Sequence, residues 1–395
     1  MAELIDSKTT TLDGRGAETA RRRRWATLPL ALAIACGGNP APPADSAWGS
    51  GFEAGPYAVG FRDEVVIRTT GDGIARPLTL SVWYPARASG DRMRLGELLT
   101  LALREGQLEE ARGLAPEAAL AAATTGDSTA IPRETARAAL EAATLAARNA
   151  VPAGGRFPLV LWGSRHATVL AQAPLAELLA SHGTVVATVW SSEPPLAFIW
   201  EEKPESEKEA TLAAQTDDLR FALATLRSDP TVDAGRTVLI AWSYGGQTVG
   251  RVQELEPGVR GVIGLDANIA PARAEESLRL RHPFLWLIGR DTTRRGLERL
   301  DSLDAPVLLA RLPELAHGDF NAMESHLPAR LGADTLFPWS RGGEVGIRGY
   351  EALARMTLVA TLAFQEDPAA ELVTIVERLR HAARNTRVEV RGSAP

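Results

Sequence analysis

One serine stands in a sequence context that could make it a nucleophile. Ser243 follows the short apolar run 237–242 and precedes Tyr-Gly-Gly and a segment that is typical of a helix start. A strand, a sharp turn and a helix in this order hold a serine hydroxyl at the tip of the turn. Such a crowded turn requires small residues two positions before and after the serine, and these are Ala241 and Gly245. A glycine-rich turn after a buried strand is the alternative interpretation.

A nucleophilic serine needs a histidine to take its proton and an acid to orient that histidine. Asp266 directly follows the apolar run 259–265, and His317 lies in a loop of small residues after the run 307–312. Serine, acid and histidine therefore occur in the order that a strand-turn-helix scaffold requires. Asp291, after the run 283–288, is the competing acid.

The other candidate bases are weaker. His326 is a rival a short distance beyond His317, on an expected helix. Asp319 would either brace the loop of His317 or, the preferred interpretation, be an ordinary surface aspartate. Three further histidines are expected at structural or solvated positions: His182 at a helix end, His282 before a strand and His381 on a polar helix.

The charge that develops on an attacked carbonyl oxygen must be met by backbone N–H groups. Tyr244, directly after the serine, would supply the first group, and the loop after the run 157–162 the second. Distance from that strand selects His166, with Arg165 as the alternative. Trp242, directly before the serine, is expected to be buried with little direct part in the chemistry.

An aromatic loop after the run 183–190 is the expected docking site for an acyl or lipid chain. Its candidate contacts are Trp190, Phe198 and Trp200. Packing of these side chains beneath neighbouring helices is an equally weighted alternative.

Strands and helices alternate from about residue 50 and would position these groups. The runs at 63–68 and 78–85 predict an antiparallel start, whereas the continuous apolar runs at 157–162 and 183–190 predict strands buried on both faces. The chain therefore predicts an α/β fold, a mostly parallel sheet with helices on both faces. The expected helices lie at 173–182 (ending before Gly183), 207–228, 350–365 and 369–385.

Residues 88–150 interrupt this alternation. They are rich in Ala, Leu, Glu and Arg, with helical spacing near 95–103 and again near 139–146, and Pro132 is typical of a helix start. We expect an inserted pair of helices. A lid over the site and packing at the edge of the sheet are the two interpretations.

The bulk composition excludes several classes of function. Of the 395 residues, 45% are hydrophobic and 23% charged, as in ordinary globular proteins. The net charge of -6 argues against a nucleic-acid partner. One cysteine and six histidines without ligand spacing predict no metal site, and the serine chemistry needs no cofactor.

The N-terminal segment has the features of an export signal. Four arginines at 21–24 precede the short apolar stretch 25–36, and a Pro-rich polar spacer follows. The ending Ala-Ile-Ala-Cys36 resembles a bacterial lipobox, in which the cysteine carries the lipid. We expect a signal and linker at 1–48, a globular domain at 49–385 and a tail at 386–395. The protein would be exported, either periplasmic or anchored to the membrane through Cys36; a disordered N-terminus is the alternative.

The chain resembles the α/β hydrolases and, among them, platelet-activating-factor acetylhydrolase and its bacterial relatives. The resemblance runs from about residue 56 to 365 and rests on Pro85 closing a Val-Trp-Tyr strand, Phe157-Pro-Leu-Val, Leu179-Ala-Ser-His-Gly-Thr-Val-Val, Trp242-Ser-Tyr-Gly-Gly and Leu265-Asp-Ala. It implies an α/β-hydrolase fold and a serine hydrolase that cleaves short-chain or lipid-like carboxylic esters through an acyl-enzyme. In that branch the acid lies in the Leu-Asp segment, which favours Asp266 over Asp291.

Two departures from this family leave other functions open. Ser164-Arg165 replaces the usual His-Gly or Pro-Gly pair, and Ala241 replaces a glycine. The alternatives are a dienelactone-hydrolase-like or peptidase-like acyl hydrolase, and a catalytically silent protein that binds a ligand or partner.

Overall fold

A mixed sheet of eleven strands organises the computed structural model of the chain. The structure describes residues 52–87, 90–163, 168–191, 204–268, 281–290, 305–334, 337–366, 372–382 and 387–391. These residues belong to the compact unit Pro40–Pro395. The predicted signal segment 1–48 and Cys36 lie outside the described residues.

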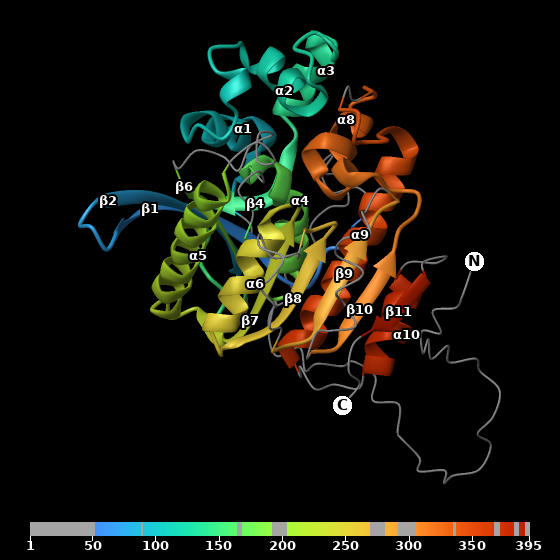
Figure 1. Cartoon of the computed structure of the whole chain (residues 1–395). Helices are drawn as coiled ribbons and strands as arrows, with labels where there is room; N and C mark the ends of the chain where they lie inside the picture. Colours follow the sequence, from blue (N-terminus) through green and yellow to red (C-terminus); the bar gives the residue numbers. More distant parts are fainter. Residues whose placement is uncertain are drawn as a thin grey trace, which may run out of the picture. The chain divides into compact units, whose positions relative to one another are not determined.

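Six strands form the parallel centre of the sheet, in the order β6–β5–β7–β8–β9–β10 (Figure 1). They are β5 (Phe157–Trp162), β6 (Val185–Ser191), β7 (Val232–Trp242), β8 (Val259–Leu265), β9 (Phe284–Ile288) and β10 (Val307–Arg311). The flanking strands are β1 (Ala58–Thr69), β2 (Ala75–Ala86), β3 (Arg92–Arg94), β4 (Ala143–Arg148) and β11 (Arg387–Arg391).

The long helices cover both faces of this centre. They are α4 (Val169–Ser181), α5 (Glu205–Arg227), α6 (Gly245–Leu255), α9 (Gly343–Glu366) and α10 (Leu372–Ala382). Alternate residues of one strand take part in two different cores. Leu239 and Ala241 of β7 pack with α5 and α6, whereas Ile240 and Trp242 pack with α4 and α9. The predicted two-sided burial of the parallel strands is therefore confirmed.

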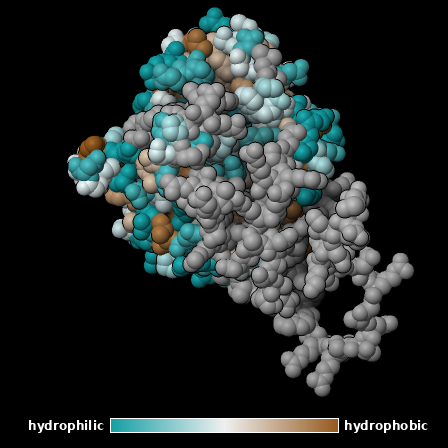
Figure 2. Space-filling view, viewed as in Figure 1, coloured by the Kyte–Doolittle hydropathy of each residue, from teal (hydrophilic) through white to brown (hydrophobic). Residues whose placement is uncertain are grey.

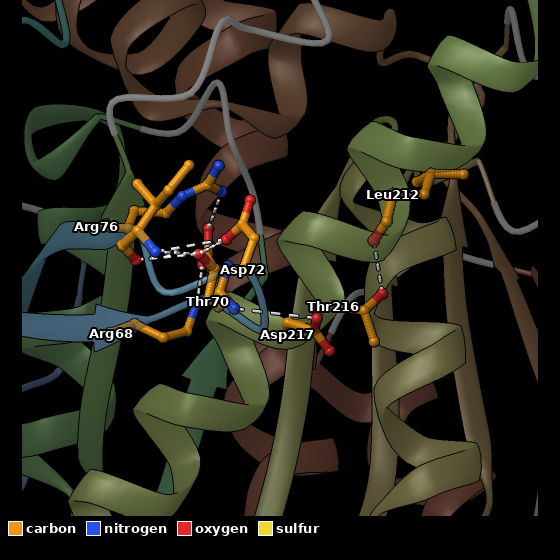
Figure 3. A network of polar contacts seen from close by, with 9 residues as sticks. Arg68, Thr70, Asp72, Arg76, Leu212, Thr216 and Asp217 are labelled. Atoms are coloured by element: carbon orange, nitrogen blue, oxygen red, sulfur yellow. Dashed lines mark hydrogen bonds and ion pairs between the residues drawn. The ribbon is translucent and has the colours of Figure 1, made fainter.

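The first two strands form the predicted antiparallel hairpin. Ion pairs near the tip of this hairpin attach it to α5 (Figure 3). Arg68 donates from Nε to Asp218 at 2.7 Å, and its Nη1 lies 3.9 Å from Asp217. Arg76 also faces Asp218, at 3.6 Å. The ion pair between Arg68 and Asp218 is nearly fully buried.

The insertion at 88–150 contains more than the predicted pair of helices. Its helices are α1 (Leu95–Arg104), η1 (Glu109–Ala111), α2 (Pro116–Thr125) and α3 (Arg133–Leu140), the last beginning directly after Pro132 as predicted. The predicted helix across 139–146 is wrong, because strand β4 begins at Ala143. This strand pairs with both β1 and β3 and extends the sheet.

A buried carboxylate explains why alanine-rich β4 is a strand. Glu177 of α4 accepts the backbone N–H groups of Leu145 at 2.9 Å and Ala146 at 3.3 Å. These contacts and the pairing with β1 outweigh the helix propensity of alanine. Burial raises the pKa of Glu177 to about 7.

The insertion packs into the apolar core of the domain. Leu98, Leu101 and Leu108 belong to the same buried cluster as Leu170 of α4 and Met323. Figure 1 shows α1, α2 and α3 beyond the ends of the central strands, near α8 (Leu327–Arg330). The packing interpretation thus has direct support, and the lid interpretation stays a prediction.

The chain end adds an element that the sequence did not predict. Residues 387–391, assigned to a C-terminal tail, form β11, which pairs antiparallel with β10. On the face shown in Figure 2 the described surface is mainly hydrophilic, with scattered hydrophobic residues. Within the described segments, no helix combines the length and hydrophobicity needed to cross a membrane.

Candidate active site

The turn between β7 and α6 has the geometry predicted for a nucleophilic serine. Ser243 adopts a φ of 54°, a left-handed conformation that L-residues rarely adopt. Its neighbours leave no space for larger side chains. Ala241 is fully buried, and a Cβ on Gly246 would lie 2.7 Å from the carbonyl oxygen of Asn268. The small residues around the serine therefore reflect close backbone approach.

The structure brings Ser243, His317 and Asp266 together from three separate loops. The Nε2 atom of His317 lies 3.0 Å from the Ser243 Oγ, and its Nδ1 atom lies 2.6 Å from the Asp266 Oδ2. Ser243 follows β7, Asp266 follows β8 directly, and His317 begins η4 (His317–Phe320) after β10. The three side chains form one continuous hydrogen-bonded chain.

Backbone contacts fix the carboxylate of this chain. Asp266 has a φ of 44°, and its Oδ1 accepts the N–H of Gly289 at 2.9 Å. Its side chain is 5% exposed, whereas that of His317 is 33% exposed. An ionised carboxylate only accepts hydrogen bonds, so the Nδ1 atom of His317 carries the proton. The Nε2 lone pair is then directed at the serine hydroxyl.

The loop of His317 is braced by Asp319, which is fully buried. Its Oδ2 accepts the N–H of Ala316 at 2.8 Å, and its Oδ1 accepts those of Arg341 and Gly342 at 2.9 and 3.2 Å. The preferred expectation of a surface aspartate is therefore wrong. The sequence did not reveal this because two of the partners lie beyond residue 340.

A second carboxyl group, that of the half-buried Glu324 in η5 (Ala322–His326), approaches the same loop. Its Oε2 accepts the indole N–H of Trp339 at 2.6 Å and would be 2.7 Å from a Cβ placed on Gly318. Burial raises its pKa to about 7, while the nearby His317 acts in the opposite direction. No sequence pattern marked Glu324, because its position depends on tertiary packing.

Trp242 lies directly against His317. The two rings are stacked, with centroids 5.1 Å apart and 21° between their planes. The indole Nε1 also donates to the backbone carbonyl of His317 at 3.2 Å. The expectation that Trp242 is buried is confirmed. That it takes little direct part in the chemistry stays a prediction, because these contacts join it to His317 and not to a reacting atom.

The other histidines within the described segments lie apart from this chain of side chains. His326 is buried. Its ring stacks on Phe52, with centroids 5.8 Å apart, and lies tilted against Tyr350, with centroids 5.1 Å apart. The positions of the other three agree with the predictions: His182 caps the end of α4, His282 precedes β9, and His381 is exposed on α10.

Several predicted site residues fall outside the described segments. These residues are the oxyanion candidates Arg165 and His166, the rival acid Asp291, and Phe198 and Trp200 of the aromatic loop. Trp190 is described: it lies near the end of β6, opposite Thr79 of β2, and is half-buried. Tyr244 caps the N-terminus of α6. Among the described residues, no group of three His, Cys, Asp or Glu side chains could hold a metal ion.

Comparisons with known proteins identify the fold. No protein-family model and no curated protein matches this chain. Among solved structures, a ferulic acid esterase from Streptomyces cinnamoneus is similar, with 20% sequence identity and a TM-score of 0.56. The match covers 78% of this chain and 89% of that one. Together with the sheet order and the serine turn, it shows that this chain has the α/β-hydrolase fold.

Proposed function

We propose that this protein hydrolyses carboxylic esters, with Ser243 as nucleophile, His317 as general base and Asp266 as its charged partner. The observation that carries this proposal is the continuous chain of contacts, 3.0 Å from Ser243 to His317 and 2.6 Å from His317 to Asp266. Both distances are within the range that proton transfer requires. The esterase activity named for the similar structure agrees with this assignment.

The reaction proceeds in two halves. The Nε2 of His317 removes the hydroxyl proton as the Ser243 oxygen forms a bond to the acyl carbon. The resulting imidazolium donates that proton to the leaving alcohol as the ester bond breaks, leaving an acyl-enzyme. Water then gives a proton to Nε2 and attacks the acyl carbon, and the proton returns to Ser243 as the acid leaves. Asp266 stabilises the imidazolium in both halves.

The oxyanion is assigned to two backbone amides. Tyr244 supplies the first, because it stands at the N-terminus of α6, where helix amides and the helix dipole favour negative charge. His166, with Arg165 as its alternative, is proposed for the second. In the sequence these residues lie between Gly163 and Thr168. Thr168 caps the start of α4.

The substrate is proposed to be a small ester with a short or lipid-like acyl chain. Trp190, Phe198 and Trp200 are the proposed contacts of that chain. The contact of His317 with an aspartate after β8 supports the branch of platelet-activating-factor acetylhydrolase over other α/β hydrolases, because that branch carries its acid in the Leu-Asp segment. Esters of aromatic acids belong in the same test panel because of the similar esterase.

We also propose that residues 1–48 export the protein and that Cys36 anchors it to the bacterial membrane. The basic and apolar stretches before Cys36 support this assignment. A full-length Cys36→Ser variant should lose membrane partition while retaining ester hydrolysis. A variant that still partitions into membranes would exclude lipidation as the anchor.

The enzyme assignment is tested with a fluorophosphonate probe and with p-nitrophenyl acetate and butyrate. The parent should be labelled and should hydrolyse these esters, whereas Ser243→Ala should do neither and should keep its thermal unfolding transition. Ester hydrolysis by Ser243→Ala at the parental rate would show that this serine is not the nucleophile. A parent that takes no label would favour a catalytically silent protein.

A further inference from the structure

We infer that Trp242 is a positioning residue for His317: its indole face holds the imidazole in the plane of the proton transfer and stabilises its protonated form. This inference rests on the proposed function and names a group that supports the base. Trp242 directly precedes Ser243 in the sequence, so the proposed nucleophile and the aromatic residue that contacts its base, His317, are adjacent.

Two different contacts tie Trp242 to His317. The stacking contact, with centroids 5.1 Å apart and planes 21° apart, restrains the tilt of the imidazole. The hydrogen bond from the indole Nε1 to the His317 carbonyl, at 3.2 Å, holds the main chain. Rotation about the side-chain bonds of His317 would break the stacking even where the main-chain contact persists.

The neighbouring contacts leave the imidazole little freedom. Its two nitrogen atoms face Asp266 and Ser243, and the next amide along the chain, that of Gly318, donates to the carbonyl of Trp339 at 2.7 Å. Trp242 itself is 6% exposed and stands in the strand position paired with Leu265, directly before Asp266. The tryptophan therefore belongs to the rigid sheet, and the histidine to the loop that the sheet positions.

The indole face also interacts with the charge that forms during the reaction. When His317 accepts the serine proton, a cation develops beside the electron-rich face of Trp242. A cation–π contact with tryptophan is the strongest of the aromatic series and gains strength where water is excluded. Trp242 should thus favour the transition state, in which the imidazole is charged, over the ground state, in which it is neutral.

Three carboxyl groups lie near this imidazole: Asp266 in direct contact, Glu324 of η5, whose pKa the nearby His317 lowers, and Asp319 within η4. All three are retained when only Trp242 is replaced. A change in the proton affinity of the base can then be assigned to the tryptophan.

The test compares Trp242→Leu and Trp242→Phe with the parent by the rate of fluorophosphonate labelling across pH. Labelling needs the activated serine but no turnover. We expect Trp242→Leu to be labelled about 3- to 30-fold more slowly at its optimum, since a cation–π contact contributes roughly 0.7 to 2 kcal/mol. The acid limb of its pH profile should move to lower pH by about half a unit or more. Trp242→Phe, with its weaker aromatic face, should show a smaller shift in the same direction.

Trp83→Leu is the matched control, because it removes another fully buried tryptophan from β2. It should lower the melting temperature and leave the acid limb in place. If Trp242→Leu does not fold, Trp242→Phe decides the matter. An acid limb that coincides with that of the parent in a folded Trp242 variant would overturn the inference. An unlabelled parent would instead remove the proposed function itself.

Discussion

The backbone N–H of Asn268 donates to the carbonyl of Ser243 at 2.7 Å, so the serine turn is bonded to the loop that carries Asp266. The amide of Asp266 is in turn bonded to the carbonyl of Leu287 in β9, also at 2.7 Å. These contacts join the ends of three neighbouring parallel strands. The separation between the backbones of Ser243 and Asp266 is therefore set by main-chain hydrogen bonds.

Gly246 lies where the serine turn meets the loop of Asp266, and the space around it is too small for a larger side chain. A Cβ here would lie 2.7 Å from the Asn268 oxygen and 2.9 Å from the Cβ of Ala267, and neither atom is the end of a flexible chain. We expect Gly246→Ala to lower the free energy of unfolding by about 1–3 kcal/mol and to reduce kcat, because the two loops must separate. Urea denaturation and ester hydrolysis measure the two effects.

The control for this change is Gly71→Ala, where an added Cβ would meet no atom within 4 Å. It should alter stability by less than about 0.5 kcal/mol. Equal stabilities for Gly246→Ala and the parent would show that the acid loop can yield, contrary to the main-chain coupling described above.

Asp266→Asn tests the electrostatic part of the site. The asparagine oxygen can still accept the N–H of Gly289, so the loop should fold as before. Its NH2 group, a hydrogen-bond donor, would face the Nδ1–H of His317, which is also a donor. The imidazole would then favour the tautomer with its proton on Nε2, which cannot accept the proton of Ser243. We expect kcat for p-nitrophenyl butyrate to fall by about ten-thousand-fold, the loss that this change causes in a Ser-His-Asp triad. The circular dichroism spectrum should be unchanged.

Asp291→Asn is the informative comparison, because Asp291 was the rival acid in the sequence. It should retain activity within about tenfold of the parent, less than 1.4 kcal/mol in the barrier. A larger loss from Asp291→Asn than from Asp266→Asn would transfer the role of the acid to Asp291.

The sequence was most informative where local patterns decide the structure. A buried strand followed by small residues around a serine allows few conformations, and both the turn at Ser243 and the strand ends before Asp266 and His317 follow from such patterns. Continuous apolar runs likewise predicted the parallel strands and their burial on both faces.

The sequence was least informative where distant groups decide. The alanine-rich segment 143–148 favours a helix by propensity and becomes a strand through contacts with β1 and Glu177. Strand β11 is short and charged, and it is defined by its pairing with β10. The contact of Trp242 with His317 joins residues in different elements and has no signature in either local sequence.

The raised pKa of Glu324 predicts that the free energy of unfolding depends on pH. Its pKa is raised to about 7 in the folded protein, against an ordinary value of 4.5. From about pH 4.5 to 7 the folded state therefore holds a proton that the unfolded state has lost, and the free energy of unfolding falls as pH rises through this window. The full difference is on the order of 3 kcal/mol. Glu324→Gln should remove this dependence.

Urea denaturation of both proteins at pH 5 and pH 8 measures the effect. Glu177, whose pKa is also raised to about 7, is present in both proteins and cancels in the comparison. Parallel stability curves for the parent and Glu324→Gln across this pH range would mean that Glu324 is already ionised at pH 5 in the folded state.

The ion pair between the β1–β2 hairpin and α5 predicts different effects for two adjacent aspartates. Both face Arg68, but the side chain of Asp218 is 5% exposed and that of Asp217 is 57% exposed. Asp218→Asn leaves the buried guanidinium of Arg68 without its close charged partner, so we expect it to lower the free energy of unfolding by about 3 kcal/mol. Asp217→Asn, at 3.9 Å and in water, should cost less than about 1 kcal/mol. Urea denaturation at low and high salt distinguishes the two variants. Salt screens the exposed pair of Arg68 and Asp217, so the loss of stability from Asp217→Asn should shrink at high salt, whereas that from Asp218→Asn should persist. Equal losses from the two variants would contradict the assignment of the hairpin's attachment to the buried pair.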